Sequence, residues 1–244
     1  MSEIFNNNYL LARSRWIDRR LSELPVVRTG QLRGVEVIRK YSTSKRGKSS
    51  YNTYSPSNPM YESLKSVVNE RLSLISEQKI LPHANISITP VGMIKMTDEK
   101  WDSIQSSTNT RDYTGEYYHN GIRMRSRFEL LVASVLDSLN LKYKYEVSLK
   151  LGGGTISPDF LVYLPELGMC FVIECLGMVD SSDYTYTNGI KISKYLSSGY
   201  VLNRDLILLC GTRDTLPDAS IIRDLIVLSI NFIANMSVSF SCRS

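Results

Sequence analysis

One carboxylate inside an apolar segment constrains this chain more than any other feature. Residues 170–178 read CFVIECLGM, and Glu174 is the only charged residue among them. A short apolar run of this kind predicts a central strand that is covered on both faces. A carboxylate in such a strand carries a large desolvation cost unless it pairs with a cation or binds a metal. Glu174 therefore requires a partner elsewhere in the chain.

The surrounding segments predict an α/β core. Apolar residues recur at three- and four-residue steps over residues 124–139, which predicts a helix packed on a core. The remaining predicted elements are three antiparallel strands at residues 142–151, 156–164 and 169–178, a helix at 183–198, a strand at 205–210 and a helix at 221–236. The last strand can join the sheet in parallel through a helical crossover, which makes the predicted core an α/β sandwich.

Residues 1–96 are predicted to form a basic α+β extension, and residues 97–244 the core. The extension is expected to contain a helix at 3–22, strands at 34–41 and 51–54, and a helix after Pro59. The first fifty residues carry eleven Lys or Arg against four Asp or Glu, although the whole chain has a net charge of only +5. Such a cationic segment suits a phosphate backbone, with Lys45, Arg46 and Lys48 at an exposed hairpin tip; a solvated turn is the alternative.

Composition limits the kind of metal and the cellular location. The chain has only two histidines, and its four cysteines form no CxxC pair, so any metal should be held by oxygen ligands and the thiols should be buried and free. No run approaches 18 uninterrupted apolar residues, and the first residues lack the features of a secretory signal. We therefore expect a cytoplasmic protein that does not bind membranes.

The predicted strands bring two carboxylates together. Asp159 follows Pro158 at the start of one strand, and the strand of Glu174 comes next, at a spacing of about 4.8 Å. Such a pair could share Mg²⁺ or Mn²⁺, which would activate a water for attack on a phosphodiester. Lys191, on the following helix, is the candidate cation for the developing charge, and Glu129, at the border of the first core helix, is a candidate third metal ligand.

Each of these residues also has a purely structural interpretation. Asp159 could be a turn residue, and Glu174 could belong to a structural ion pair. Glu129 could be an ordinary acid at the border of a helix, and Lys191 a solvated surface residue. Only their joint placement on helix, strand, strand and helix favours catalysis.

Several segments of this chain together resemble the PD-(D/E)xK nuclease superfamily, which has the restriction-endonuclease-like fold. They are RSRFE, YKYEVSLKL, SPDF, VIECLGM, the lysine-bearing helix and DLILLC. They are similar to a bacterial and phage branch that reads roughly RSxxE, PDF, WEHxGM and K-x-x-x-Y. The resemblance covers about residues 95–235. It implies that Asp159 and Glu174 bind metal, that Glu129 belongs to the site and that Lys191 contributes from its helix.

Two departures from that pattern bear on activity. The usual E-x-K lysine lies two residues after the glutamate, where this chain has Leu176, and Cys175 replaces a histidine of the narrower branch. Either Lys191 has taken over the lysine role or the chain is a non-cleaving member.

The leading hypothesis is a Mg²⁺- or Mn²⁺-dependent DNA endonuclease of the bacterial cytoplasm or of a phage-infected host cell. DNA-binding residues are expected at the start of the first core helix, where a ligand would offset the unfavourable charge on the helix dipole. The candidates are Arg123, Arg125, Arg127 and, on the later helix, Lys194. Arg125 could instead pair with a neighbouring acid.

A second copy of the chain or a partner subunit is a further expected partner. Two other functions remain open. One is a DNA-binding or assembly subunit on an inactive nuclease fold, and the other is a virion or complex-scaffolding protein.

Overall fold

The computed structural model describes residues 4–43, 49–105, 116–152 and 154–240. Two compact units divide the chain. The larger unit comprises Met1–Ala12 and Asn85–Ser244, and the smaller comprises Arg13–Ala84. Helix α1 (Asn7–Glu23) begins in the larger unit and ends in the smaller. The predicted tip residues Lys45, Arg46 and Lys48 lie outside the described residues.

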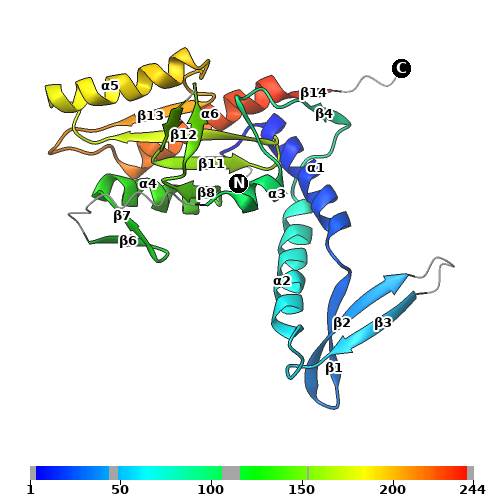
Figure 1. The fold of residues 1–244 in the computed structure, drawn as a ribbon. Coiled ribbons are helices and arrows are strands. Elements are labelled where there is room, and N and C mark those ends of the chain that lie inside the picture. Colours follow the sequence, from blue (N-terminus) through cyan, green and yellow to red (C-terminus); the bar gives the residue numbers. More distant parts are fainter. Residues whose placement is uncertain (1–3, 44–48, 106–115, 153, 241–244) are drawn as a thin grey trace. The chain divides into compact units, whose positions relative to one another are not determined.

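A mixed β-sheet forms the centre of the larger unit (Figure 1). Its strands run in the order β13-β12-β11-β8, and the short β5 adds to β12. Strands β8, β11 and β12 pair antiparallel, whereas β13 pairs parallel to β12. The predicted parallel addition of the last strand is therefore confirmed. The strands are β5 (Ile94–Lys95), β8 (Lys142–Tyr145), β11 (Phe160–Leu164), β12 (Met169–Leu176) and β13 (Leu206–Cys210).

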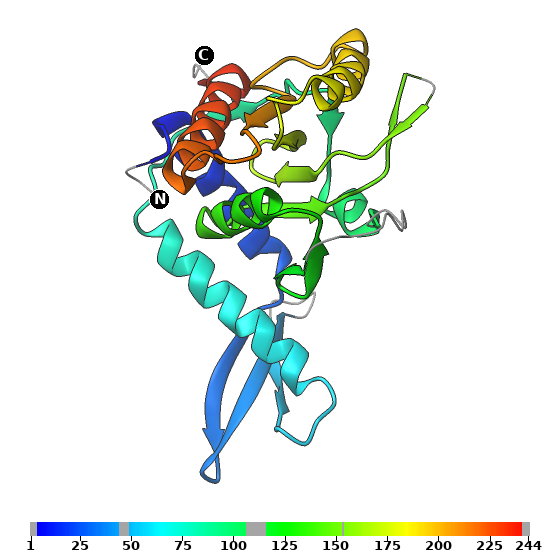
Figure 2. The ribbon, with the colours of Figure 1, turned by 90° about the vertical axis from the view of Figure 1, so that its left-hand side faces the viewer.

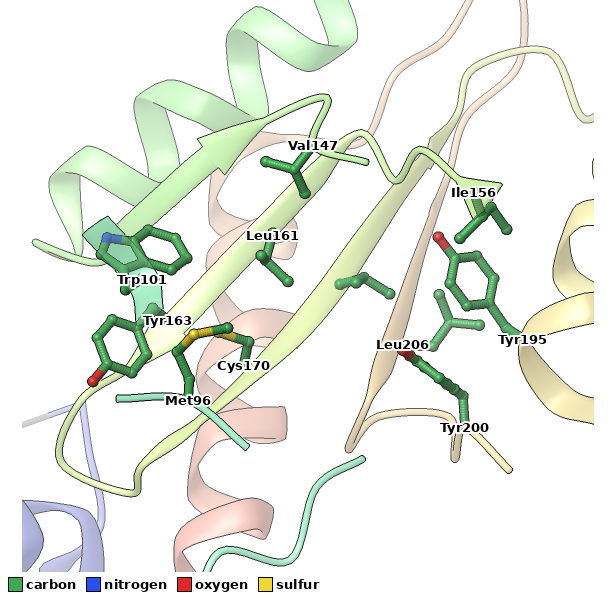
Figure 3. Packing of buried hydrophobic residues seen from close by; sticks show 11 residues of the cluster. Met96, Trp101, Val147, Ile156, Leu161, Tyr163, Cys170, Tyr195, Tyr200 and Leu206 are labelled. Atoms are coloured by element: carbon green, nitrogen blue, oxygen red, sulfur yellow. The ribbon is translucent and has the colours of Figure 1, made fainter. Parts of the chain in front are cut away.

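Helices cover both faces of this sheet, which explains why β11 and β12 are buried along their whole length. Figure 2 shows α4 (Arg127–Ser138) and α6 (Ala219–Ser237) on one side and α5 (Ser182–Ser197) on the other. On the α5 side, Leu161 and Val172 pack with Tyr195 (Figure 3). The short helix α3 (Asp98–Ser103) lies on the same side through Trp101, and the Thr97 side chain caps its start.

The chain between β8 and β11 departs from the predicted meander. The sequence suggested one strand over residues 142–151, but β8 ends at Tyr145, and Glu146 adopts a positive φ of 46°. Strands β9 (Leu149–Leu151) and β10 (Gly154–Ile156) then form a separate two-stranded ribbon. The residues of the predicted strand at 142–151 are therefore divided between the main sheet and this ribbon.

Further short elements complete the larger unit. Two more strand pairs are β4 (Ile86–Ile88) with β14 (Val238–Phe240), and β6 (Tyr117–His119) with β7 (Ile122–Met124). Within the described residues the chain is therefore a mixed α/β protein with six helices.

The smaller unit is a three-stranded antiparallel sheet packed on one helix. Its elements are β1 (Val27–Leu32), β2 (Val35–Thr43), β3 (Ser49–Tyr54) and α2 (Tyr61–Gln78). Val27 and Ile38 from the sheet contact Tyr61, Leu64 and Val68 of the helix. Strand β1 was not predicted, whereas the other two strands and the helix were.

Two compositional expectations can be compared with the structure. Cys170 and Cys175 are buried free thiols as expected, but Cys210 is exposed, and Cys242 lies outside the described residues. By length and composition alone, one described helix, α6, could cross a membrane. Its apolar residues Ile222, Ile226 and Ile230 are fully buried, and α6 contacts α4 and β13.

Candidate active site

Strand register brings Asp159 and Glu174 together. Phe160 of β11 pairs with Ile173 of β12, and the same register continued by one residue sets Asp159 opposite Glu174. Alternation along the strands puts both side chains on the face that α5 covers. Both are buried, with relative exposures of 5% for Asp159 and 1% for Glu174. The backbone N–H of Cys175 donates to Asp159 Oδ2 at 2.7 Å and fixes that carboxylate.

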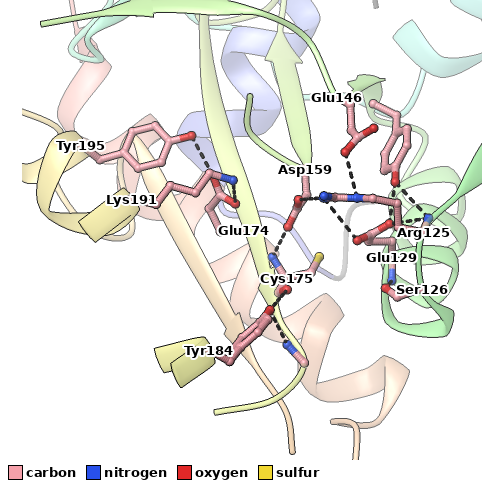
Figure 4. Close-up of polar contacts among 12 residues, drawn as sticks. Arg125, Ser126, Glu129, Glu146, Asp159, Glu174, Cys175, Tyr184, Lys191 and Tyr195 are labelled. Atoms are coloured by element: carbon pink, nitrogen blue, oxygen red, sulfur yellow. Dashed lines mark hydrogen bonds and ion pairs between the residues drawn. The ribbon is translucent and has the colours of Figure 1, made fainter. Parts of the chain in front are cut away.

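Helix α5 supplies two donors to Glu174 (Figure 4). Lys191 Nζ donates to Oε2 at 2.5 Å, and the Tyr195 hydroxyl donates to Oε1 at 2.7 Å. Lys191 and Tyr195 are four residues apart, so they share one face of the helix. The sequence required a partner for Glu174, and Lys191 and Tyr195 provide it. The structural ion pair, one of the two interpretations from sequence, exists in the protein.

These two donors do not fully compensate for the environment of Glu174. Burial, followed by the neighbouring charge of Asp159, raises the pKa of Glu174 to about 8 against the opposing effects of Lys191 and Tyr195. A raised pKa means that the environment disfavours the charged carboxylate. Additional positive charge beside the Asp159–Glu174 pair would therefore stabilise the ionised form of Glu174.

The Arg125 side chain lies among three carboxylates. Its Nη2 donates to Asp159 Oδ1 at 2.7 Å and lies 3.7 Å from Glu129 Oε1, while its Nε lies 2.8 Å from Glu146 Oε1. Burial acts to lower the pKa of Arg125, but the three acids outweigh it and the net pKa is raised. The structure thus shows the ion pairing that was the alternative for Arg125. Contact with DNA phosphates stays a prediction.

Glu129 holds the start of α4. Its Oε2 accepts from the backbone N–H of Arg125 at 2.9 Å and from the Tyr145 hydroxyl at 2.6 Å. In return, the Ser126 side chain accepts from the backbone N–H of Glu129 at 3.2 Å. This arrangement is a variant of the capping box, in which the first serine and the glutamate three residues later satisfy free N–H groups. Burial raises the pKa of Glu129, with Asp159 contributing next.

An open cleft of about 1580 Å³ contains the predicted site. Asp159, Glu174 and Glu129 all line it, and so does Lys191. Among the cations on its wall are Arg127, Lys194 and Arg213. Arg123 of β7 is exposed and is not among the lining residues. The cleft therefore gathers the four predicted catalytic residues and places additional positive charge beside them.

The donor set fits a divalent cation that is bound mainly by water. Among the described residues, no group of three or more His, Cys, Asp or Glu could hold a metal ion. Asp159 and Glu174 can supply two carboxylates, and Mg²⁺ commonly uses one or two protein carboxylates and keeps several waters. Glu129 is occupied by its capping contacts, so its role as a third ligand stays a prediction.

Three contact residues were not assigned a role from sequence. Tyr195 occupies the last position of the K-x-x-x-Y pattern, and its four-residue spacing from Lys191 was a usable signal. Tyr145 ends β8 and Glu146 follows it, and their contacts with Glu129 and Arg125 depend on tertiary structure. No local sequence pattern indicates those contacts.

Comparison of the chain with models of protein families, with curated proteins and with solved structures gives no match. The function must therefore be argued from the cleft itself.

Proposed function

We propose that the larger unit is a divalent-metal-dependent DNA endonuclease with a restriction-endonuclease-like fold of the PD-(D/E)xK type. The observation that carries this proposal is the register that sets Asp159 opposite Glu174 in a cation-lined cleft, with Lys191 bonded to Glu174. The proposed cofactor is Mg²⁺ or Mn²⁺, the proposed substrate is DNA and the proposed location is the cytoplasm. A second copy or a partner subunit would supply the other site for double-strand cutting.

The element order supports this fold assignment. The core begins with helix α4, which is followed by the three antiparallel strands β8, β11 and β12. Helix α5, the parallel strand β13 and the final helix α6 come next. Asp159 and Glu174 lie where the resemblance expects them, directly before β11 and within β12. The β9–β10 ribbon is an addition to this order.

Asp159 and Glu174 are the proposed metal ligands. A bound Mg²⁺ or Mn²⁺ would polarise the scissile phosphate and lower the pKa of an attacking water. The Cys175 N–H orients Asp159, while Tyr195 orients Glu174. Lys191 is close enough to Glu174 to place its ammonium beside the same phosphate, where it would stabilise the charge that develops during hydrolysis.

The position of Lys191 allows it to take the role of the lysine that is missing from the E-x-K position. Leu176 occupies the usual lysine position and is buried. Lys191 reaches Glu174 from α5, and its side chain keeps 26% exposure toward the cleft that it lines. The observed contact favours transfer of the lysine role from the strand to the helix.

A non-cleaving DNA-binding or assembly subunit is the second candidate. The observation in its favour is that Arg125 already pairs with Asp159, and Lys191 with Glu174. A site whose acids all have cationic partners can be stable without metal. Calorimetric titration with Mn²⁺ distinguishes the two candidates, because only the nuclease requires metal binding that Asp159→Asn and Glu174→Gln weaken.

The decisive experiment incubates the protein with supercoiled and linear DNA, with and without Mn²⁺. Glu174→Gln and Asp159→Asn are the test variants, and Glu62→Gln, at an exposed position of α2, is the matched control. We expect metal-dependent cleavage by the wild type and the control and none by the test variants. Equal cleavage by Glu174→Gln, or no cleavage by folded wild type that binds Mn²⁺, would remove the nuclease proposal.

A further inference from the structure

The sheet of the smaller unit has one face that α2 does not cover. The helix packs against Val27 and Ile38. Because side chains alternate along a strand, Arg28, Arg39 and Tyr41 point to the opposite face. Tyr51 pairs with Tyr41 across β2 and β3 and therefore shares that face. We call these four residues, Arg28, Arg39, Tyr41 and Tyr51, the Arg–Tyr face.

Arginines and tyrosines alternate in direct contact on the Arg–Tyr face. The Arg28 guanidinium lies 5.5 Å from the centroid of the Tyr41 ring, and that of Arg39 lies 5.3 Å from the Tyr51 ring. The two rings are 5.5 Å apart at 49°. Tyr51 is 54% exposed, so its ring remains accessible to a ligand. The four side chains form a continuous surface of rings and positive charge.

Gly30 of β1 makes room for one of these arginines. A Cβ at position 30 would lie 3.1 Å from Arg39 Cζ, so the bare glycine lets the guanidinium lie against the strand. Within the part of the chain that the structure describes, Arg39 Nε is buried and has no hydrogen-bond partner. Arg39 is therefore held flat beside Tyr51 by packing.

The positive charge of the protein resides in the smaller unit. Residues 13–84 contain fourteen Lys or Arg against six Asp or Glu, a formal charge of +8, whereas the whole chain carries +5. The larger unit is consequently acidic overall. A polyanion is attracted to the smaller unit through this charge difference.

From these contacts we infer that the Arg–Tyr face binds single-stranded DNA. Unpaired bases stack on exposed aromatic rings, while arginines neutralise the phosphates between them. A duplex keeps its base faces stacked inside and offers the tyrosines no surface. An acidic peptide would use the arginines but not the rings. The choice of DNA over RNA rests on the proposed function of the larger unit; the stacking argument does not.

Binding is tested by fluorescence anisotropy with a labelled oligothymidylate of about twelve nucleotides, in EDTA so that no cleavage occurs. We expect Tyr51→Ala to weaken binding about tenfold and Tyr51→Phe to leave it within about twofold, because phenylalanine keeps the ring. Arg39→Gln should reduce the salt dependence by about one phosphate contact. A duplex of the same length should bind more weakly than the single strand.

Two controls separate stacking from folding and from general charge. Tyr186→Ala removes an exposed tyrosine of α5, and Asn52→Ala changes β3 on the face toward α2; both should bind as the wild type does. A fall in melting temperature of Tyr51→Ala without a change in affinity would assign the rings to sheet stability and overturn the inference. Equal binding of duplex and single strand would also overturn it, and tighter binding of oligouridylate would overturn the choice of DNA.

The same assay separates this inference from the nuclease proposal. Glu174→Gln lies in the larger unit and should bind the oligonucleotide as tightly as the wild type. A wild-type protein that binds the oligonucleotide but does not cleave DNA with Mn²⁺ would remove only the nuclease proposal. Cleavage of duplex DNA without any single-strand binding would remove only the inference about the Arg–Tyr face.

Discussion

Arg125 Nη2 donates to Asp159 Oδ1 at 2.7 Å, on one of the two carboxylates that we propose as metal ligands. The other oxygen of Asp159 accepts from the Cys175 backbone. A metal that binds Asp159 through Oδ1 must therefore share that oxygen with Arg125 or displace it. Arg125 therefore pairs with Asp159 when no metal is bound, and it competes with the cation for this carboxylate when metal is present.

Arg125→Gln is expected to destabilise the metal-free protein by about 3 kcal/mol, because it leaves buried carboxylates without their cation. Mn²⁺ should raise the melting temperature of this variant more than that of the wild type, since the competitor is gone. Thermal and urea unfolding with and without Mn²⁺ measure both effects. Arg223→Gln, which breaks the exposed pair with Asp224, should cost less than about 1 kcal/mol. Equal costs for the two variants would contradict the proposed role of Arg125.

Lys191→Met should reduce the cleavage rate about a hundredfold or more while leaving DNA affinity within about threefold, because the ammonium is proposed to act on the developing charge. Lys194→Met is the matched control, because Lys194 lies three residues after Lys191 on the same helix. This variant should mainly weaken DNA binding. Single-turnover cleavage separates rate from affinity. A rate loss in Lys194→Met as large as in Lys191→Met would show that general positive charge of the helix matters and not this one amine.

Much of the larger unit follows from the sequence because its signals are local. The apolar run around Glu174 predicts a buried strand, and the apolar steps over residues 124–139 predict the helix that became α4. A strand that is buried on both faces gives a continuous apolar run, whereas a helix that is buried on one face gives apolar residues at three- and four-residue steps. The β9–β10 ribbon was missed because a break at Glu146 depends on one residue with positive φ, which no alternation pattern records.

The candidate site divides in the same way. The closeness of Asp159 and Glu174 could be predicted from their neighbouring strands, and so could the need of Glu174 for a partner. That Lys191 is this partner was not predicted, because the contact forms only in the folded chain. The position of Arg125 among three acids could not be predicted, because Glu146 reaches it from a different element. Neither interpretation of Glu129 included a helix cap, although the S-x-x-E spacing from Ser126 is a signal that could have identified the capping contact.

Affinity for Mn²⁺ should rise with pH up to about 8. The folded-state pKa of Glu174 is raised to about 8, mainly by burial, so below that pH the residue carries a proton that metal binding must release. The affinity should therefore fall about tenfold per pH unit from pH 8 to pH 6 and level off above pH 8. Calorimetry in buffers of different ionisation enthalpy measures both the affinity and the released proton. An affinity that is constant between pH 6 and 8 contradicts the prediction.

Tyr195→Phe should move this pH dependence upward. The Tyr195 hydroxyl donates to Glu174 Oε1 and helps to lower the pKa of Glu174, so its removal makes the carboxylate harder to ionise. One buried oxygen also loses its partner, at a cost of about 1–3 kcal/mol in the free energy of unfolding. The midpoint of Mn²⁺ affinity against pH should rise, while Tyr186→Phe on the exposed side of α5 should leave it unchanged. A destabilised variant with an unchanged midpoint would limit Tyr195 to packing.

Glu129→Gln and Asp159→Asn distinguish a helix cap from a metal ligand. Glu129 Oε2 already accepts from Arg125 N–H and from the Tyr145 hydroxyl, and a glutamine oxygen can keep one or both contacts. We therefore expect Glu129→Gln to lower stability by about 1 kcal/mol, as a weakened cap does, and to change Mn²⁺ affinity less than threefold. Asp159→Asn should lower that affinity more than tenfold. Unfolding and calorimetry on the same two proteins provide the measurements, and a tenfold loss of affinity in Glu129→Gln would establish it as the third ligand.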